Sequence, residues 1–458
     1  MFSKETYIAR RAKLKETVGS GLLLFLGNEE SGMNYADNTY HFRQDSTFLY
    51  FFGLAHAGLA AIIDIDNDRE IIFGDELSID AIVWMGTQPS LKNLSELVGI
   101  SEVLPSKDIE NYLKNAQTKK QEIHYLPTYR AEHQIKLQSW LGIYPGAEMP
   151  SVQFILGVVN QRNYKSAEEI VEIEKACIAT ADMHLAAMRM VRPGIKESEV
   201  AAVVAEAAFS LDYQLSFPII ATINGQTLHN HYHGNVIKSG DMLLLDAGAE
   251  TEMGYAGDMS STIPADRTYT ARQKEIYDIS VAAHEAAVAA LKPGVLFEDV
   301  YDLSLKTIAD GLKSMGFMKG DSMEAVKAGA CALFMPCGLG HMMGLDVHDM
   351  ENLGEKYVGY GGREKSVQFG RKSLRLGRKL EPGFVLTIEP GIYFIPELID
   401  LWRSENKFSE FINYDKVETY KDFSGIRNEE DYLITETGAR LLGKKIPIHT
   451  EEVEAIHC

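Results

Sequence analysis

The second half of the chain contains an internal repeat, and this feature constrains the fold more than any other. Residues 192–200 read RPGIKESEV and residues 292–300 read KPGVLFEDV, each between two segments with helical periodicity. Downstream of each copy lies an apolar strand that ends in an acid, Asp246 in the first and Glu389 in the second. A second acid-bearing strand follows each of these, at 255–258 and at 425–429. Three features in the same order indicate a duplication that folds as two helix–helix–strand halves around a shared cleft.

The first third of the chain has a different pattern, in which short apolar runs alternate with polar helical stretches. We expect strands at 21–27, 47–54, 59–65, 70–73 and 152–159, and helices at 4–18 and 90–97. The polar stretch 160–165 interrupts this pattern. A long helix follows, with a capping box at Ser166 and Glu169 and a stop at Pro193-Gly194. We therefore predict two domains, residues 1–160 and 161–458.

Composition excludes several classes of protein and of site. A chain of 458 residues with 45% hydrophobic and 24% charged residues is ordinary globular protein, of two or three domains by length. The net charge of −20 argues against binding to nucleic acid or to anionic membranes. The four cysteines form no close-spaced pair, so a disulfide framework or a thiolate zinc site is not expected. No apolar run is long enough to span a bilayer, and residues 1–15 are too polar for a secretion signal. We expect a cytoplasmic protein.

The acids at the strand ends predict a metal centre. A carboxylate flanked by apolar strand residues is buried, and a buried carboxylate requires a cation or strong hydrogen-bond donors. If the two halves face each other, four carboxylates converge: Asp246, Asp258, Glu389 and Glu429. His341, within Gly338-Leu-Gly-His-Met-Met-Gly344, adds one nitrogen ligand. Such a set suits two divalent ions, with Mn²⁺ the first choice and Zn²⁺, Co²⁺ or Fe²⁺ as alternatives. Two such ions roughly 3.5–4 Å apart can polarise a carbonyl and activate water, which is hydrolase chemistry.

Each of these residues taken alone has a simpler interpretation. Asp246 and Glu389 resemble ordinary acids at a turn or a strand end, and the acidic run 429–431 is typical of a solvated face. A histidine between glycines is more often structural than a ligand. Gly338-Leu-Gly340 also resembles a phosphate loop, but Gly344 is one residue late for the dinucleotide fingerprint. The duplication favours the metal site because it places the acids at equivalent positions.

Five motifs carry a resemblance to a known family: Asp246-Ala-Gly, Ala256-Gly-Asp258, Gly338 to Asp349, Thr387-Ile-Glu389-Pro-Gly-Ile-Tyr393 and Ile426-Arg-Asn-Glu429-Glu-Asp431. They resemble the pita-bread metallopeptidases of the creatinase, aminopeptidase P and prolidase group, and within it the Xaa-Pro dipeptidases and Xaa-Pro aminopeptidases. Residues 40–50 are similar to the N-terminal domain of these enzymes. The resemblance implies an α/β creatinase-like domain followed by an α+β pita-bread catalytic domain with a pseudo-twofold duplication. It also implies a homodimer or homotetramer.

The resemblance implies a role for each candidate residue. Asp258 and Glu429 match carboxylates that bridge the two metals, Asp246 completes one metal's ligands, and His341 and Glu389 complete the other's. Glu389 also matches an acid that moves a proton. His348 matches a histidine that contacts the scissile carbonyl. His229 matches a further substrate-facing histidine, and His231 is a rival for that role because Asn230-His-Tyr-His233 permits a two-residue shift.

The implied reaction is hydrolysis of the bond between an N-terminal residue and a following proline. The substrates are then Xaa-Pro dipeptides or longer peptides with proline second. Arg375, fourteen residues before Glu389, matches the prolidase arginine that binds a dipeptide's free carboxylate, although it could equally belong to a solvated basic loop at 371–379. We favour the dipeptidase, with the aminopeptidase as the alternative. A non-catalytic pita-bread binding protein, or a metal-free amidine or amide hydrolase, is more remote because the ligands are present.

One position departs from the family pattern. Both enzyme types usually have a histidine four residues before the metal histidine, and this chain has Cys337 there. Because that histidine is not a metal ligand, we expect metal binding to be unaffected. Its hydrogen bond to substrate is what the replacement puts in doubt.

Overall fold

The computed structural model describes residues 1–457 and divides into two compact units. The first comprises Met1–Arg162 together with Met350–Tyr357, and the second comprises Asn163–Asp349 and Val358–Cys458. The chain therefore passes from the first unit to the second between Arg162 and Asn163, where we predicted a boundary after residue 160. Among the described residues, no helix has both the length and the apolar content that crossing a bilayer requires.

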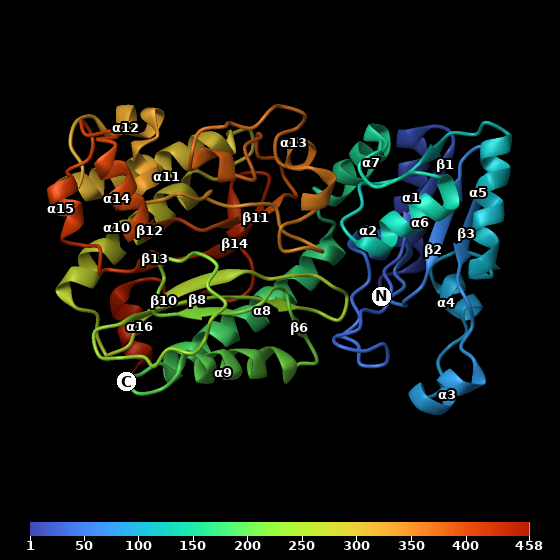
Figure 1. The fold of residues 1–458 in the computed structure, drawn as a ribbon, viewed down its shortest axis with the longest axis horizontal. Helices are drawn as coiled ribbons and strands as arrows, with labels where there is room; N and C mark the ends of the chain where they lie inside the picture. The colour runs from blue at the N-terminus through green and yellow to red at the C-terminus, as the bar shows by residue number, and fades with distance from the viewer. Residues whose placement is uncertain (458) are drawn as a thin grey trace. The chain divides into compact units, whose positions relative to one another are not determined.

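The first unit is built on one mixed sheet in the order β4-β3-β2-β1-β5 (Figure 1). Its strands are β1 (Leu22–Leu26), β2 (Ala60–Asp64), β3 (Arg69–Phe73), β4 (Glu102–Leu104) and β5 (Ile123–His124). The β1–β2 and β2–β3 pairs are antiparallel, whereas β1–β5 and β3–β4 are parallel. The strands predicted at 21–27, 59–65 and 70–73 are confirmed.

Helices cover both faces of this sheet. The helices of this unit are α1 (Lys4–Val18), α2 (Ser46–Phe52), α3 (Ile79–Met85), α4 (Leu91–Leu97), α5 (Ile109–Thr118), α6 (Ala131–Leu141) and α7 (Val152–Arg162), with short 3₁₀ turns η1 (Ser106–Asp108) and η3 (Glu351–Leu353). Of these, α3 has no buried residue and does not cover the sheet. Leu22 and Leu24 pack with α5 and α6 on one face. Phe25, which points to the other face, contacts Phe52 of α2 and Phe154 of α7 at ring distances of 4.9 and 5.0 Å. Successive side chains of β1 therefore point to opposite faces of the sheet and pack into two separate hydrophobic cores.

Two predicted strands of this unit are helices. The run 47–54 lies in α2, where the Asp45 side chain accepts the Phe48 N–H at the start and Gly53 in the left-handed region ends the helix. All residues of α2 except Leu49 are buried, so its sequence is apolar on every side and lacks a helical period. The run 152–159 lies in α7, where Val152 and Gln153 are exposed; a nearly continuous apolar run of strand length does not by itself distinguish a strand from a helix. The two predicted helices, at 4–18 and 90–97, are confirmed as α1 and α4.

The second unit contains the two predicted halves. The first half holds α8 (Ala167–Met190), α9 (Glu197–Phe209), β6 (Gln214–Leu215), β7 (Ile220–Thr222), β8 (Met242–Ala247), β9 (Ala249–Glu250) and β10 (Met259–Pro264). The second half begins with α10 (Ala271–Ala290), α11 (Phe297–Ser314), α12 (Ser322–Ala328), η2 (Ala330–Leu333) and η4 (Arg371–Ser373). Between η2 and η4 in the chain, α13 (Glu355–Val358) belongs to the first unit except for Val358. It continues with β11 (Val385–Ile388), β12 (Gly391–Tyr393), α14 (Pro396–Ser404), α15 (Tyr414–Glu418), β13 (Gly425–Arg427), β14 (Glu430–Ile434), β15 (Ala439–Leu441) and α16 (Thr450–Ile456).

The two copies of the repeat have the same local structure. The first separates α8 from α9 and the second separates α10 from α11. Gly194 and Gly294 both have positive φ, 96° and 86°, a conformation that disfavours other residues. The capping box at Ser166 and Glu169 opens α8 as predicted, and Thr270 with Gln273 makes the equivalent box at α10. The pattern that revealed the duplication thus specifies the turn between each pair of helices.

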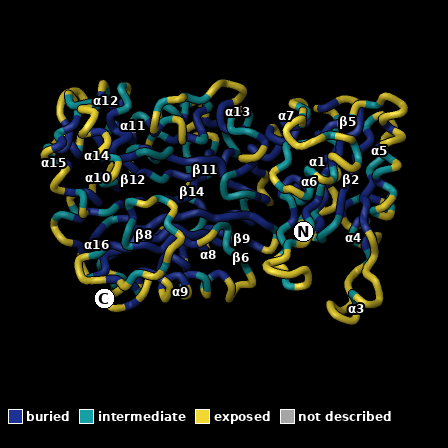
Figure 2. The backbone as a smooth tube through the Cα atoms, viewed as in Figure 1, coloured by how far each residue is buried: buried dark blue, intermediate teal, exposed yellow. Residues whose placement is uncertain are grey.

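The two halves meet where their strands carry the acids. Sheet β10-β8-β7 belongs to the first half and sheet β11-β14-β15 to the second. A bridge between Ser260 and Glu429 joins them, and the Thr262 hydroxyl oxygen bonds both the N–H and the carbonyl of Arg427 at 3.1 Å. Figure 2 shows that these central strands are buried. The candidate residues lie along this seam.

Candidate metal centre

The second unit contains a cavity of about 220 Å³ that is open to solvent on one side. Its lining contains the five predicted metal ligands, three of the four predicted substrate-side residues and several apolar side chains. These are Asp246, Asp258, His341, Glu389 and Glu429; His229, His231 and His348; and Phe217, Pro218, Ile220, Leu228, Cys337 and Val347, together with Arg427. The sequence repeat and the histidine motif therefore converge in one place.

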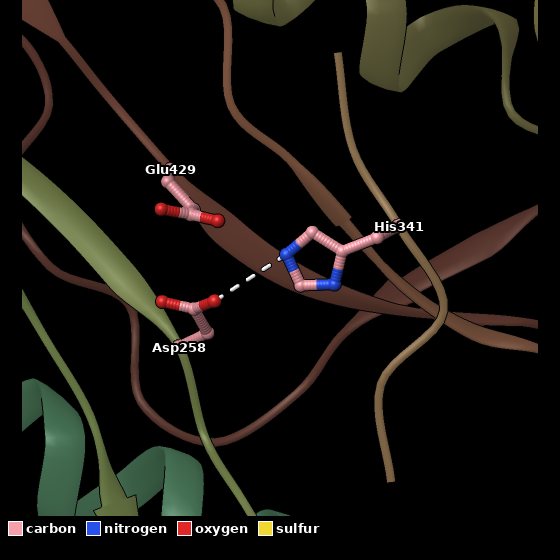
Figure 3. A group of neighbouring side chains, drawn as sticks. All are labelled: Asp258, His341 and Glu429. Carbon is pink, nitrogen blue, oxygen red and sulfur yellow. Dashed lines mark ion pairs between the residues drawn. The ribbon is translucent and has the colours of Figure 1, made fainter. Parts of the chain in front are cut away.

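Three of the ligand candidates form a tight group (Figure 3). Ligand atoms of Asp258, His341 and Glu429 lie within 4.8 Å of one another. Asp258 precedes β10, and Glu429 lies between β13 and β14. Glu429 is fixed to the first half through Ser260, whose carbonyl accepts the Glu429 N–H at 3.0 Å and whose hydroxyl donates to Glu429 Oε2 at 2.7 Å. All three residues are buried, so their charges are poorly solvated.

The other two candidates lie beside this group. Glu389 follows β11, and its Oε1 lies 3.5 Å from His341 Nε2, which is also 3.4 Å from Asp258 Oδ2. Asp246, near the end of β8, has one oxygen bonded to Arg427 and the other unpaired. Asp258 Oδ1 is likewise buried without a hydrogen-bond partner. Unpaired carboxylate oxygens beside a histidine nitrogen are what divalent cations bind, so these residues fit the predicted metal ions.

Burial and mutual repulsion shift the protonation of the group. Burial raises the pKa of Asp258 and of Glu429 well above the usual carboxylate range, and neighbouring carboxylates raise both further. Burial also raises the pKa of Glu389 to about 7. Burial lowers the pKa of His341 well below its usual value. The protein alone therefore favours neutral forms, which bound cations would convert to ionised carboxylates around a neutral imidazole.

The tautomer of His341 is set by its own backbone. Its Nδ1 lies 3.1 Å from the carbonyl oxygen of Met342, which can only accept a hydrogen bond. Nδ1 therefore carries the proton, and the Nε2 lone pair faces Asp258 and Glu389. A metal-binding histidine needs this arrangement.

Comparison with known proteins identifies the family. Residues 171–436, more than half of the chain, match the model of metallopeptidase family M24. The chain belongs to metallopeptidase family M24. Residues 7–124 match the N-terminal domain of aminopeptidase P. The M24 fold and the preceding aminopeptidase P-type domain confirm the predicted two-domain pita-bread architecture.

Relatives along the whole chain are Xaa-Pro peptidases of both kinds. The chain is 30% identical to the human Xaa-Pro dipeptidase, covering 98% of this chain and 91% of the relative. It is 29% identical to the Xaa-Pro aminopeptidase of Escherichia coli, covering 99% and 98%. Among solved structures, proline aminopeptidase P II from Yersinia pestis matches with a TM-score of 0.82 and 25% identity over 100% of this chain and 99% of that one. Escherichia coli aminopeptidase P in complex with substrate matches with a TM-score of 0.80 and 27% identity over 100% and 98%.

The substrate-side candidates of this M24 chain are not equally placed. His229, His231 and His348 line the cavity, and His229 and His231 are exposed. Arg375 is not among the described residues that line it. Half-buried between η4 and β11, Arg375 nevertheless acts on the site electrostatically, since its charge opposes the rise that burial causes in the Glu389 pKa.

Arg427 is a site residue to which the sequence analysis assigned no role. It is buried and donates from Nε to the Ser260 hydroxyl at 2.9 Å, from Nη1 to the Tyr393 hydroxyl at 2.9 Å and from Nη2 to Asp246 Oδ2 at 2.5 Å. The guanidinium therefore holds the candidate ligand Asp246 in place. It also connects the two halves, because Asp246 and Ser260 belong to the first half and Tyr393 to the second. Its signal in the sequence was an arginine two residues before Glu429, in the short strand that leads to this acid, where a buried cation needs an anionic partner.

Proposed function

We propose that this M24 metallopeptidase hydrolyses the bond between an N-terminal residue and a following proline, with Xaa-Pro dipeptides as its preferred substrates. One observation carries the proposal: five candidate metal-ligand side chains from both halves line one cavity. Support also comes from the relatives, which are named Xaa-Pro dipeptidases and Xaa-Pro aminopeptidases.

We further propose two divalent ions as cofactors, with Mn²⁺ preferred. Asp258 and Glu429 would be shared between the ions, with Asp246 on one side and His341 and Glu389 on the other. Ions held by such a set act as Lewis acids on a carbonyl and acidify water. The preference for Mn²⁺ follows from a ligand set that is mostly carboxylate oxygen with one imidazole.

The side chains of the cavity would provide proton transfer, hydrogen bonds to the carbonyl and a surface for the proline ring. Glu389, which lies in the cavity beside His341, would take up a proton and then deliver it to the departing proline nitrogen. His348 and His229 would donate hydrogen bonds to the carbonyl before proline, where negative charge develops. The apolar side chains of the cavity provide a surface for the pyrrolidine ring, which carries no N–H for a general protease to bind.

The choice between dipeptidase and aminopeptidase depends on the substrate's carboxylate. Arg375 supports the dipeptidase because a planar guanidinium next to the site can bind a free carboxylate with two hydrogen bonds. The aminopeptidase remains the second candidate because full-length structural likeness to aminopeptidase P has TM-scores of 0.80 and 0.82. The test is release of the N-terminal residue from Ala-Pro, Ala-Pro-Ala and longer Ala-Pro peptides by the Mn²⁺-supplemented protein. Strong preference for Ala-Pro is expected; equal or faster cleavage of the longer peptides would assign the aminopeptidase.

We also propose a homodimer or homotetramer, because one helix of the first unit has no buried residue. α3, coloured as exposed in Figure 2, carries Ile79, Val83, Trp84 and Met85. Residue Trp84 is 85% exposed. An apolar helix this exposed is typical of an interface. Light scattering should give a mass of at least two chains, and Trp84→Ser should lower it; a monomeric wild type would contradict the proposal.

Finally, we propose a cytoplasmic location. The described cysteines Cys177, Cys331 and Cys337 are free thiols, which fits a reducing compartment. Fractionation of cells that produce the protein tests this directly, and recovery from an extracytoplasmic fraction would contradict it.

A further inference from the structure

A buried ion pair lies outside the set of candidate ligands and substrate-side residues. Lys165 Nζ is 2.8 Å from Asp349 Oδ2, and both side chains are 1% exposed. Lys165 lies just before α8, and its N–H donates to the Gly383 carbonyl at 2.9 Å. Asp349 immediately follows His348 in the sequence. The pair therefore links the start of the second unit to the histidine that faces the cavity.

The segment from His341 to Asp349 is a closed loop that carries both site histidines. The Asp349 N–H donates to the Met342 carbonyl at 2.9 Å and thereby closes it. Gly344 lies directly against the ion pair. A Cβ at this position would be 2.8 Å from Asp349 Oδ2 and 2.8 Å from Lys165 Cε. Only glycine leaves room for the pair as it stands.

The two histidines of this loop have different supports. His341 is tied to β11, because its N–H donates to the Thr387 hydroxyl at 3.2 Å and its carbonyl accepts the Thr387 N–H at 3.0 Å. His348 is adjacent to Asp349, whose N–H and carboxylate are both engaged. The two imidazole rings lie 4.3 Å apart between centroids, at 73°. A shift of His348 would therefore change its aim into the cavity while His341 kept its place.

We propose that Lys165 and Asp349 are positioning residues that hold His348 in its productive orientation and leave metal binding to the β11-anchored part of the loop. The ion pair has no net charge, so its loss alters geometry more than the potential at the ligand carboxylates. Because removal of one partner leaves an uncompensated buried charge, the informative variant replaces both partners with apolar residues. The turnover part of this inference rests on the proposed function.

The test compares Lys165→Met/Asp349→Leu with wild type, with His348→Ala and with the combination of all three changes. We expect the Lys165/Asp349 variant to keep the wild-type number of bound Mn²⁺ ions, to lose at least tenfold in kcat on Ala-Pro and to change KM by less than threefold. When the same two changes are added to His348→Ala, kcat on Ala-Pro should fall by less than a further twofold, because the imidazole that they position is already absent. Lys306→Met, which breaks an exposed pair with Asp310, is the matched control and should leave kcat unchanged.

A second readout does not depend on turnover. Hydrogen exchange of the metal-free protein should become faster in residues 345–349 of the double variant, with 341–343 and the Lys306→Met control unchanged. If the wild type shows no Xaa-Pro cleavage, the proposed function fails and this readout alone decides the positioning role. If the double variant does not fold, Gly344→Ala, which displaces the pair sterically, is measured in its place. Loss of metal together with kcat, additive losses on His348→Ala, or unchanged exchange at 345–349 would each overturn the inference.

Discussion

Arg427 Nη2 lies 2.5 Å from Asp246 Oδ2, so a guanidinium is built into the cluster of ligand carboxylates. Both side chains are nearly buried, and the remaining nitrogens of Arg427 bond Ser260 and Tyr393. One cation of the protein thus compensates one ligand permanently. Its charge also opposes the rise that burial causes in the pKa of Glu389 and of Glu429, but does not cancel that rise.

We expect Arg427→Met to destabilise the metal-free protein by about 3–5 kcal/mol, because breaking a buried pair leaves Asp246 uncompensated. Mn²⁺ should restore part of this loss, since a bound cation compensates the same carboxylate. Chemical denaturation with and without Mn²⁺ measures both effects. Arg440→Met, which breaks an exposed pair with Glu174, is the control and should cost less than about 1 kcal/mol. Equal costs for the two variants would contradict the structural role of Arg427.

The stabilisation that metal provides should depend on pH. In the metal-free protein burial raises the pKa of Glu389 to about 7 and raises those of Asp258 and Glu429. When an acid has a higher pKa in the folded state than in the unfolded state, the folded protein binds more protons. Its free energy of unfolding then decreases as pH rises from the unfolded-state pKa through the folded-state pKa. At pH 8 the metal-free protein is destabilised by its ionised buried carboxylates, and bound metal removes this destabilisation. At pH 6 these carboxylates carry protons, which the metal must displace before it binds.

The expected result is a larger Mn²⁺-induced rise in Tm at pH 8 than at pH 6, at one Mn²⁺ concentration and in buffers that do not bind metal. Comparing loaded with metal-free protein at each pH cancels the titration of groups remote from the site. A rise that is equal at the two pH values, or larger at pH 6, would contradict this account.

Cys337 should be a poor nucleophile although it lines the cavity. Burial, with Glu389 adding to it, raises the pKa of its thiol to about 12. At pH 8 only about one thiol in ten thousand is then ionised. Alkylation by iodoacetamide, followed by peptide mapping, should be at least a hundredfold slower at Cys337 than in added glutathione. Comparable rates would show that the thiol is not suppressed. Because Cys337 is none of the five ligand candidates, Cys337→His should leave the number of bound metal ions unchanged.

Arg375 offers a test of substrate length. Arg375→Ala should reduce kcat/KM for Ala-Pro at least tenfold more than for Ala-Pro-Ala, because only the dipeptide places its carboxylate next to the scissile bond. Arg371→Ala, which removes from the same basic stretch a cation that pairs with Asp302, is the matched control. Equal losses on both substrates would remove the carboxylate-binding role and return Arg375 to the solvated loop.

The ligand candidates could be predicted because the duplication places acids at equivalent positions in the two halves. Each acid alone would be weak evidence for a site. Asp246 and Glu389 each look like an ordinary strand-end acid, but their equivalent places after the two repeats identify a shared cleft. The acidic run 429–431 illustrates this: its simpler interpretation was a solvated face, and all three residues are buried.

Other features lie beyond such patterns. The helix α2 was predicted as a strand because burial on nearly every side removes its helical period, and α7 because its apolar run has the length of a strand. The partners of Arg427 are close only in space: Asp246 precedes it by 181 residues and Ser260 by 167. The pairing of Lys165 with Asp349 spans 184 residues and could not be inferred from spacing either.

The most direct test of the metal centre is Asp258→Asn, measured for bound metal and for Ala-Pro hydrolysis on the same sample. The substitution is nearly isosteric, so the fold should be retained, while one ligand predicted to be shared by both ions loses its charge. We predict that the Mn²⁺-supplemented wild type binds two ions per chain and cleaves Ala-Pro, and that Asp258→Asn loses bound metal and turnover together. A variant that is fully active, or a wild type whose activity survives chelation, would contradict the account.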